Sequence, residues 1–230
     1  MTIGILTAMQ SENKLLTNIL QNPTKSVINN FTYTIGQVGD NRIVLLQCGI
    51  GKVNAAIGSS EMIRTFQPDY VISTGVAGGI DSKLSVMDVV ASEQTVYHDV
   101  WCGMGCEHGQ IQDFPTYFTS NQKLIDIASN IPTNSTTKIH TGLICTGDQF
   151  ITSQEELQKI KKNFPSGLAV DMESCAIAHT CHIFKVPFIS FRIISDTPGI
   201  ENHMEQYEDF WGTMSLRSFN ITHQFIQAIH

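Results

Sequence analysis

The stretch at residues 167–179 constrains the fold of this chain more than any other. It opens as a short apolar run with strand character, passes through two acids, Asp171 and Glu173, and continues in small residues that suit a helix. A strand leading directly into a helix is the unit of an open α/β sheet, and such sheets bind ligands where strands end. The two acids are therefore expected to face a cleft, where sugar hydroxyls can hydrogen-bond them. Asp171 is equally suited to cap a helix at 172–181.

The same alternation of strands and helices runs along the whole chain. Gly39-Asp40-Asn41 between two apolar segments predicts one hairpin, so the sheet should be mixed. The pattern predicts an α/β fold, a three-layer helix–sheet–helix sandwich with a mixed central β-sheet. We find no linker or internal repeat and expect residues 1–230 to form a single domain. Strands are predicted at 2–8, 31–38, 42–48, 70–74, 86–97, 138–146, before Asp171 and at 187–194, and helices from Gln10, at 49–67, 122–129, 154–163, 172–181 and from about Met204.

Charge and composition narrow the classes of partner. With 14 basic and 21 acidic residues the net charge is −7, whereas a duplex nucleic acid or an anionic membrane needs a basic face. A small molecule is the expected partner. The amino-terminal residues do not resemble a signal sequence, and no apolar run reaches the length of a membrane helix. The six cysteines show no C-x-x-C spacing, so we expect a protein of the reducing cytoplasm.

Three other motifs suggest binding sites more weakly. Gly49-Ile50-Gly51-Lys52 resembles a phosphate loop, but neither Ser nor Thr follows Lys52, and Asn54 stands where a dinucleotide fingerprint needs glycine. Residues 98–108 contain two histidines, two cysteines and an aspartate, yet the paired spacing and second half of a zinc site are missing. Gly75-Val76-Ala77-Gly78-Gly79 either lets the backbone pass close to a ligand or forms a tight turn. We expect neither a metal nor a cofactor.

Five residues near predicted strand or helix ends form a set with chemical meaning. Three are the acids Glu12, Glu173 and Asp196; the others are Arg192, inside an apolar strand, and Phe150, at a strand end. A buried arginine is costly without a partner, so Arg192 should meet either a ligand group or a carboxylate in a structural ion pair. Such a set can cleave an N-glycosidic bond. That reaction needs a proton for the departing base, an activated water and groups that bind the ribose hydroxyls.

At this point the chain resembles a known family, the bacterial 5′-methylthioadenosine/S-adenosylhomocysteine nucleosidases of the purine nucleoside phosphorylase-like fold. The resemblance runs over nearly the whole chain, and its weight lies in the order and spacing of several short motifs. These are Ile3-Gly4-Ile5 through Ala8-Met9 with Glu12, Ser73-Thr74-Gly75 with Ala77-Gly78-Gly79, Tyr97-His98-Asp99, Gly147-Asp148 with Phe150-Ile151, Met172-Glu173, Ala176-Ile177-Ala178-His179, and Arg192 with Ile194-Ser195-Asp196.

The resemblance implies a role for each matched position. Asp196, oriented by Ser195, would protonate N7 of adenine, and Glu12, assisted by Arg192, would activate the water. Glu173 would bind the ribose hydroxyls. Phe150 and the Ile151 backbone would bind adenine, Met9, Ile50, Met172 and Tyr207 would line the pocket for the 5′-thio group, and Val76, Ala77, Gly78 and Asp171 complete the implied substrate-binding set. The family is typically a homodimer in which the neighbouring subunit's loop, residues 102–112, closes that pocket, and it needs no metal.

The implied chemistry asks for two different carboxyl environments. Asp196 must be protonated to act as an acid, and an apolar site raises a carboxyl pKa. Glu12 must stay ionised to accept a proton from water, which a nearby Arg192 would favour. Val76 in place of a serine and Asp171 in place of a glutamate depart from the family pattern and bear on the 5′-substituent preference.

Three alternatives stay open at this level. A nucleoside phosphorylase of the same fold would use phosphate as the nucleophile, which requires several converging arginines; this chain has four arginines, and its first strand opens onto Ser11-Glu12. A nucleosidase for another 5′-modified nucleoside would share the same residues. A nucleoside-binding domain that has lost turnover is the third alternative.

Overall fold

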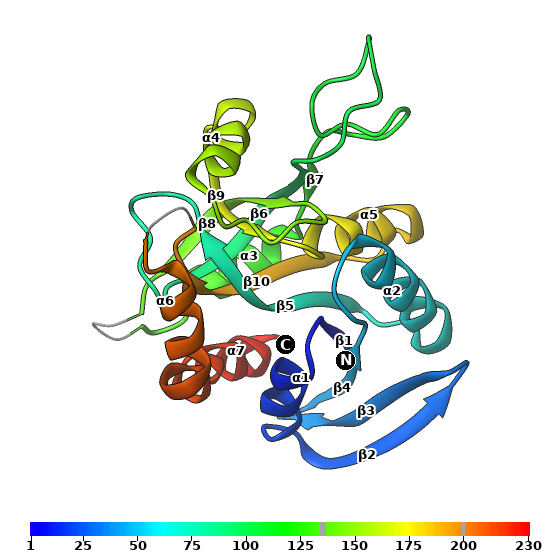
Figure 1. The fold of residues 1–230 in the computed structure, drawn as a ribbon. Helices are drawn as coiled ribbons and strands as arrows, with labels where there is room; N and C mark the ends of the chain where they lie inside the picture. The colour runs from blue at the N-terminus through cyan, green and yellow to red at the C-terminus, as the bar shows by residue number, and fades with distance from the viewer. Residues whose placement is uncertain (134–136, 199–200) are drawn as a thin grey trace.

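Within the part of the chain that the structure describes, ten strands form one mixed sheet with helices on both faces (Figure 1). The computed structural model describes residues 1–133, 137–198 and 201–230. The predicted α/β fold with a central mixed sheet is confirmed. The elements are β1 (Thr2–Thr7), α1 (Gln10–Thr17), β2 (Gln21–Ile28), β3 (Phe31–Val38), β4 (Asn41–Gln47), α2 (Lys52–Phe66), β5 (Tyr70–Gly79), β6 (Val89–Tyr97), β7 (Phe118–Thr119), α3 (Gln122–Ser129), β8 (Ile139–Thr146), α4 (Gln154–Asn163), β9 (Gly167–Asp171), α5 (Ser174–Phe184), β10 (Phe188–Asp196), α6 (His203–Asp209), the π-helix η1 (Phe210–Met214) and α7 (Ser215–Ala228).

Five of the strands close into a ring, which the sequence does not predict. Strand β10 runs parallel to β5 and antiparallel to β6, β6 continues through β8 to β9, and β9 returns to β5. Apolar side chains from every one of these strands pack in one cluster, which includes Ala77, Val90, Ile144, Ala169 and Ile194. The predicted layered arrangement therefore applies to the strands outside this ring, and the ring itself is a small barrel.

Two hydrophobic cores place the helices on opposite faces. Successive residues of a strand point to opposite sides of the sheet, and in β5 Val71 and Ile72 belong to different cores. The core with Ile72 takes in buried side chains of α1, α3 and α7, whereas the core with Val71 takes in α2 and α5. In the described residues no helix is long and apolar enough to cross a membrane.

Side-chain caps explain why two helices begin where the sequence predicts. Asn121 accepts a hydrogen bond from the Leu124 amide at 3.3 Å and starts α3. At α4, Ser153 Oγ accepts from the Glu156 amide at 3.3 Å, while the Glu156 carboxylate accepts from the Ser153 amide at 3.1 Å. This reciprocal pair satisfies two amides that the helix itself leaves unpaired.

The structure differs from the sequence-based expectations in three places. Strand β2 was not predicted, because its side chains are mostly exposed and polar and lack an apolar period. Of the two alternatives for Gly75–Gly79, the tight turn is wrong, because the segment continues β5 and pairs with β10. Helix α5 begins at Ser174, two residues later than predicted, because Asp171 ends β9 and Glu173 has a non-helical backbone.

Candidate active site

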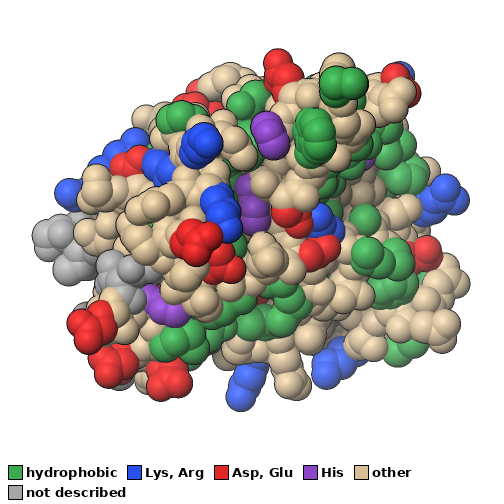
Figure 2. Space-filling model, turned by 45° about the horizontal axis from the view of Figure 1, so that its top comes forward, with side chains coloured by type: hydrophobic (Ala, Val, Ile, Leu, Met, Phe, Trp, Pro, Cys, Tyr) green, Lys and Arg blue, Asp and Glu red, His purple; other side chains and the backbone are tan. Residues whose placement is uncertain are grey.

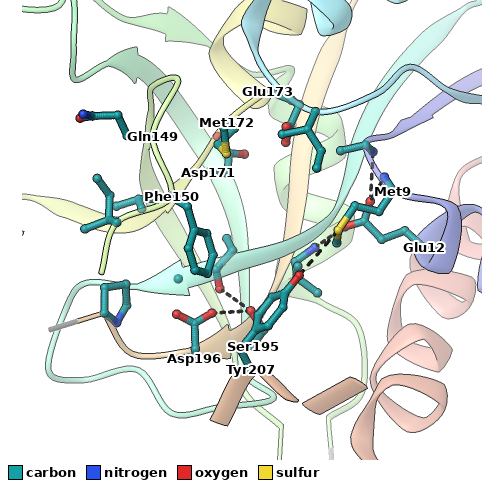
Figure 3. A pocket seen from close by; sticks show the side chains of 18 residues that line it. Met9, Glu12, Gln149, Phe150, Asp171, Met172, Glu173, Ser195, Asp196 and Tyr207 are labelled. Carbon is teal, nitrogen blue, oxygen red and sulfur yellow. Dashed lines mark hydrogen bonds between the residues drawn. The ribbon is translucent and has the colours of Figure 1, made fainter. Parts of the chain in front are cut away.

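The ends of strands β1, β5, β9 and β10 surround one pocket (Figure 3). The segment before α2, the segment after β8 and helix α6 complete its wall. In Figure 3, Glu173 and Met172 lie at the top of the view, Asp196 and Tyr207 at the bottom, and Met9 and Glu12 to the right. The lining residues are Ala8, Met9, Glu12, Ile50, Val76, Ala77, Gly78, Gln149, Phe150, Ile151, Val170, Asp171, Met172, Glu173, Ser195, Asp196, Pro198 and Tyr207.

The structure therefore brings the predicted site residues together, with one exception. Every residue of the predicted set lines the pocket except Arg192, which lies in β10 and is 1% exposed. Sequence reasoning missed Ala8, Gln149, Val170 and Pro198, each of which directly adjoins a predicted residue or follows Asp196 by two positions.

Asp196 has one bonded and one free carboxyl oxygen. Ser195 Oγ donates to Asp196 Oδ1 at 2.7 Å. Asp196 Oδ2 is buried and has no hydrogen-bond partner among the described residues. Burial raises the pKa of Asp196, while the Ser195 bond and the nearby His203 oppose this in part. The side chain thus holds a proton more readily than an exposed aspartate does, and its free oxygen lies at the pocket.

Glu12 is fixed by backbone amides at the start of α1. Glu12 Oε2 accepts from the amides of Ala8 at 3.0 Å and Met9 at 2.9 Å, and Oε1 accepts from the amide of Val76 at 3.0 Å. Burial raises the pKa of Glu12, and the charge of Arg192 and the three amides lower it only in part. The charge of Arg192 acts in the expected direction, towards ionisation, but burial outweighs it and the pKa of Glu12 is raised overall.

Gly75 makes room for this carboxyl. Its backbone has φ of +147°, and a Cβ built there would overlap Glu12 Oε1 and lie 2.9 Å from Arg192 Nη1. Only glycine combines this backbone conformation with the missing side chain. The glycine-rich segment is therefore needed for the close approach of Glu12 to β5.

Arg192 forms ion pairs with the acids of the β9–α5 junction. Its Nε lies 2.8 Å from Asp171 Oδ2, and its Nη2 lies 3.4 Å from Glu173 Oε2. Ser73 Oγ accepts a further bond from Nη2 at 2.9 Å. No ion pair between Arg192 and Glu12 is formed in the described structure, so Arg192 acts on Glu12 through its charge at longer range.

The two acids of the junction differ in how they are used. Asp171 accepts from Thr146 Oγ1 at 2.6 Å, from the Ser174 amide at 3.3 Å and from the Ser174 hydroxyl, besides its ion pair with Arg192. Its carboxylate therefore caps α5 and holds the arginine, as the structural alternative requires. Glu173 accepts from the Gly51 amide at 2.9 Å. Burial raises the pKa of Glu173, and Arg192 lowers it in part.

The segment that resembles a phosphate loop binds carboxylates instead. The Gly51 amide donates to Glu173, and the Lys52 amide donates to Asp148 Oδ1 at 2.7 Å. Lys52 Nζ lies 2.7 Å from Asp99 Oδ2 and 3.7 Å from Asp148 Oδ2. These contacts tie the start of α2 to the segment that leads to Phe150. Across the described ranges, no group of three or more His, Cys, Asp or Glu is arranged to hold a metal ion.

Comparison with known proteins agrees with this geometry. The family model described as the phosphorylase superfamily matches residues 2–227, and the chain belongs to that superfamily. The 5′-methylthioadenosine/S-adenosylhomocysteine nucleosidase of Actinobacillus succinogenes is 43% identical over 211 residues, which cover 91% of each chain. That of Hydrogenovibrio crunogenus is 40% identical over 222 residues, covering 94% of this chain and 95% of the relative. Within the superfamily, the chain belongs to the 5′-methylthioadenosine/S-adenosylhomocysteine nucleosidase family.

Solved structures are similar over the whole chain. The S-adenosylhomocysteine nucleosidase of Streptococcus pyogenes, in complex with 5-methylthiotubericidin, superposes with a TM-score of 0.93 at 33% identity and covers 100% of this chain and 98% of its own. The 5′-methylthioadenosine/S-adenosylhomocysteine nucleosidase of Neisseria meningitidis, in complex with methylthio-immucillin-A, gives a TM-score of 0.93 at 35% identity and covers 99% of both chains.

Proposed function

We propose that this pocket hydrolyses the N-glycosidic bond of 5′-methylthioadenosine, S-adenosylhomocysteine or both, releasing adenine and the 5′-thio-ribose. As a member of its family the chain is an N-ribosyl hydrolase. One observation supports the assignment above the others: Asp196, with a raised pKa and an unpartnered oxygen, shares a pocket with Glu12, which three amides hold in place. A proton donor and a proton acceptor are the two groups that this hydrolysis needs.

In this proposal Asp196 is the general acid. Its Oδ2 delivers a proton to N7 of adenine as the bond to the ribose breaks, so the base leaves uncharged. The Ser195 hydroxyl holds Oδ1 and thereby directs Oδ2 to the pocket. Protonating a leaving group in this way contributes about 10²–10⁴-fold to a rate.

Glu12 is the general base. It takes one proton from a water, whose oxygen then bonds to the ribose carbon that adenine leaves. Burial raises the pKa of Glu12, which makes its carboxylate a stronger base once ionised. The charge of Arg192 favours ionisation of Glu12, and its ion pairs with Asp171 and Glu173 hold the β9–α5 junction in place.

The remaining lining residues bind the substrate. Glu173, fixed by Gly51 and Arg192, accepts from the ribose hydroxyls. Phe150 is 48% exposed, which leaves its ring free to stack on adenine. In the same proposal Ile151 binds the edge of adenine. The 5′-thio group is contacted by Met9, Ile50, Met172 and Tyr207, and the nucleoside lies beside Val76, Ala77 and Gly78. Asp171 acts indirectly, by holding Arg192.

The phosphorylase alternative is disfavoured by the lining itself. None of the described lining residues is a lysine, arginine or histidine, whereas a phosphate nucleophile needs converging cations. Arg192, the nearest arginine, is already engaged by Asp171 and Glu173. Ionised Glu12 would also repel phosphate. Water is therefore the nucleophile that the pocket suits.

We further propose that two copies form a homodimer, in which the neighbouring subunit's loop at 102–112 closes the 5′ side of the pocket. Support comes from large apolar side chains that one copy leaves exposed on α2, on α5 and in the loop after β6. Hydrophobic side chains gather on the right of Figure 2, where Figure 1 places α2 and α5. Those on these segments are Val53, Ile57, Trp101, Met104 and Ile183, with Ile50 directly before α2. Light scattering on the purified chain tests this.

A cytoplasmic location also stays a prediction. Its support is chemical: all six cysteines are free, and three of them, Cys145, Cys175 and Cys181, are buried. Buried unpaired thiols are typical of proteins that fold in a reducing compartment.

The experiment that tests the function is a substrate panel. Adenine release is followed for 5′-methylthioadenosine, S-adenosylhomocysteine, other 5′-modified adenosines and a futalosine-like nucleoside, each with and without phosphate. We expect release without phosphate and the free sugar as product. Phosphate-dependent release with ribose 1-phosphate as product would establish the phosphorylase, and binding without any turnover would establish the non-catalytic domain.

A further inference from the structure

The hydroxyl of Tyr207 lines the pocket and has only a weak partner for its proton. Ser195 already donates to Asp196, while Glu12 and Glu173 can only accept when ionised. The Tyr207 hydroxyl donates to Met9 Sδ, at 3.6 Å. A thioether sulfur is a poor acceptor compared with oxygen. The phenol therefore gives the pocket a neutral donor that a better acceptor can recruit.

Two aromatic contacts position the ring that carries this donor. The rings of Tyr207 and Trp211 meet edge to face at 6.3 Å, and Phe150 packs edge to face on Tyr207 at 5.6 Å. These contacts hold the ring, and the hydroxyl proton points to Met9 at the pocket (Figure 3).

We propose that Tyr207 is a specificity-determining residue whose hydroxyl donates to an acceptor on the 5′ substituent of the substrate, in place of Met9 Sδ. This inference rests on the proposed function and goes beyond it by ranking substituents. The methylthio group offers only another thioether, so the exchange of one sulfur for another gains little. The homocysteine moiety offers a carboxylate, and a bond from a neutral donor to a carboxylate is among the stronger hydrogen bonds.

The charge of the lining makes this donor matter more. No lysine, arginine or histidine stands among the described lining residues of one copy, so those residues offer the carboxylate no cation. Two lining side chains can then donate to the carboxylate: the exposed amide of Gln149 and the hydroxyl of Tyr207, which already donates to Met9. Through its hydroxyl, Tyr207 favours amino-acid substituents over plain alkyl ones.

Tyr207→Phe tests the inference by removing one oxygen while keeping the ring and its aromatic contacts. The values of kcat/KM are measured for S-adenosylhomocysteine, 5′-methylthioadenosine and 5′-butylthioadenosine, which has a long substituent without the amino acid groups. We expect the ratio of S-adenosylhomocysteine to 5′-methylthioadenosine to fall about tenfold, the usual size of one such bond. The ratio of 5′-butylthioadenosine to 5′-methylthioadenosine should stay within about twofold, since neither offers an oxygen acceptor.

Tyr70→Phe is the matched control. It removes the same oxygen at the start of β5, the end of that strand away from the pocket, and it should leave all three values unchanged. Met9→Leu should act in the opposite direction, because it deletes the sulfur that competes for the hydroxyl, and the preference for S-adenosylhomocysteine should rise. It decides the question if Tyr207→Phe does not fold.

The outcomes separate this inference from the function on which it rests. If the parent chain releases adenine from none of the three nucleosides, the proposed function fails. If the parent chain is active and Tyr207→Phe lowers all three values equally, or none, the hydroxyl has no role in specificity. A rise in the ratio for Tyr207→Phe, or a fall for Met9→Leu, would equally overturn the inference.

Discussion

The hydroxyl of Ser195 lies 2.7 Å from one carboxyl oxygen of Asp196, and the other oxygen of that carboxyl is buried without a partner in the described chain. The two oxygens therefore have separate tasks. One holds the side chain in position, and the other is left for a ligand. Because burial raises the pKa of the same carboxyl, the free oxygen is the natural place for a transferable proton.

Asp196→Asn should remove the acid and keep the fold. Asparagine can still accept from Ser195, but it has no proton to give to adenine, so we expect kcat to fall by about 10²–10⁴-fold. Binding of a nucleoside analogue should change far less. Steady-state kinetics and calorimetry measure the two quantities. Asp126→Asn, on the surface of α3, is the control and should be fully active. Near-normal turnover of Asp196→Asn would remove Asp196 from the acid role.

The same variant should alter how stability depends on pH. The folded chain holds the Asp196 proton more tightly than the unfolded chain, because burial raises the pKa. Well below the ordinary aspartate pKa both states are protonated, and the pKa shift contributes nothing to unfolding. As pH rises towards the folded pKa, ionisation favours the unfolded chain, and the parent loses stability. The asparagine of the variant does not titrate, so the melting temperature of Asp196→Asn should exceed that of the parent by more at about pH 8 than at about pH 4. A constant difference across this range would contradict the shift.

Gly75→Ala should inactivate the general base, Glu12, by displacing its side chain rather than by replacing it. A methyl group at this position overlaps Glu12 Oε1, so Glu12 must leave its three amides. Misplacing a catalytic group by an ångström costs about 10²-fold in rate, and we expect kcat to fall by at least that much. Gly39→Ala is the matched control: Gly39 also has positive φ, at +57°, but a Cβ there meets nothing within 4 Å. An equal fall in kcat for the two variants would show that backbone strain, rather than displacement of Glu12, caused the loss.

Arg192→Met should destabilise the fold as well as the site. It leaves Asp171 and Glu173 buried without their cation, and breaking a buried ion pair in this way typically costs about 3–5 kcal/mol. Each kcal/mol lowers the melting temperature of a chain this size by roughly 2–4 °C. Denaturant unfolding and thermal melts measure the loss. Lys159→Met breaks the exposed pair with Glu155 on α4 and should leave the melting temperature unchanged. A loss no larger than in that control would mean that the acids find other partners.

Sequence reasoning succeeded where the signal is local. Helices α3 and α4 begin and end at the predicted residues, because Asn121 and Ser153 are caps that the sequence itself displays. It failed for β2, which pairs with β3 at the edge of the described sheet and leaves most of its side chains in solvent. An edge strand with little buried surface has no apolar period to detect.

The sequence predicts which residues form the site more fully than it predicts how those residues pair with one another. Residue type and position at strand ends are enough to gather Glu12, Glu173 and Asp196. They do not decide which acid Arg192 pairs with, because that depends on where Asp171 and β10 meet in space. The resemblance implied that Arg192 assists Glu12, and the residues alone left a structural ion pair open; the structure forms that ion pair, at the β9–α5 junction.

The ring of β5, β9, β8, β6 and β10 has a dynamic consequence. A strand held on both sides by neighbours cannot peel away by itself, and β5 and β10, which carry Gly75, Arg192 and Asp196, are held in this way. Their amide protons should exchange with deuterated solvent only when the entire chain unfolds. The amide protons of β2, an edge strand of the sheet, should exchange early, long before those of β5 and β10.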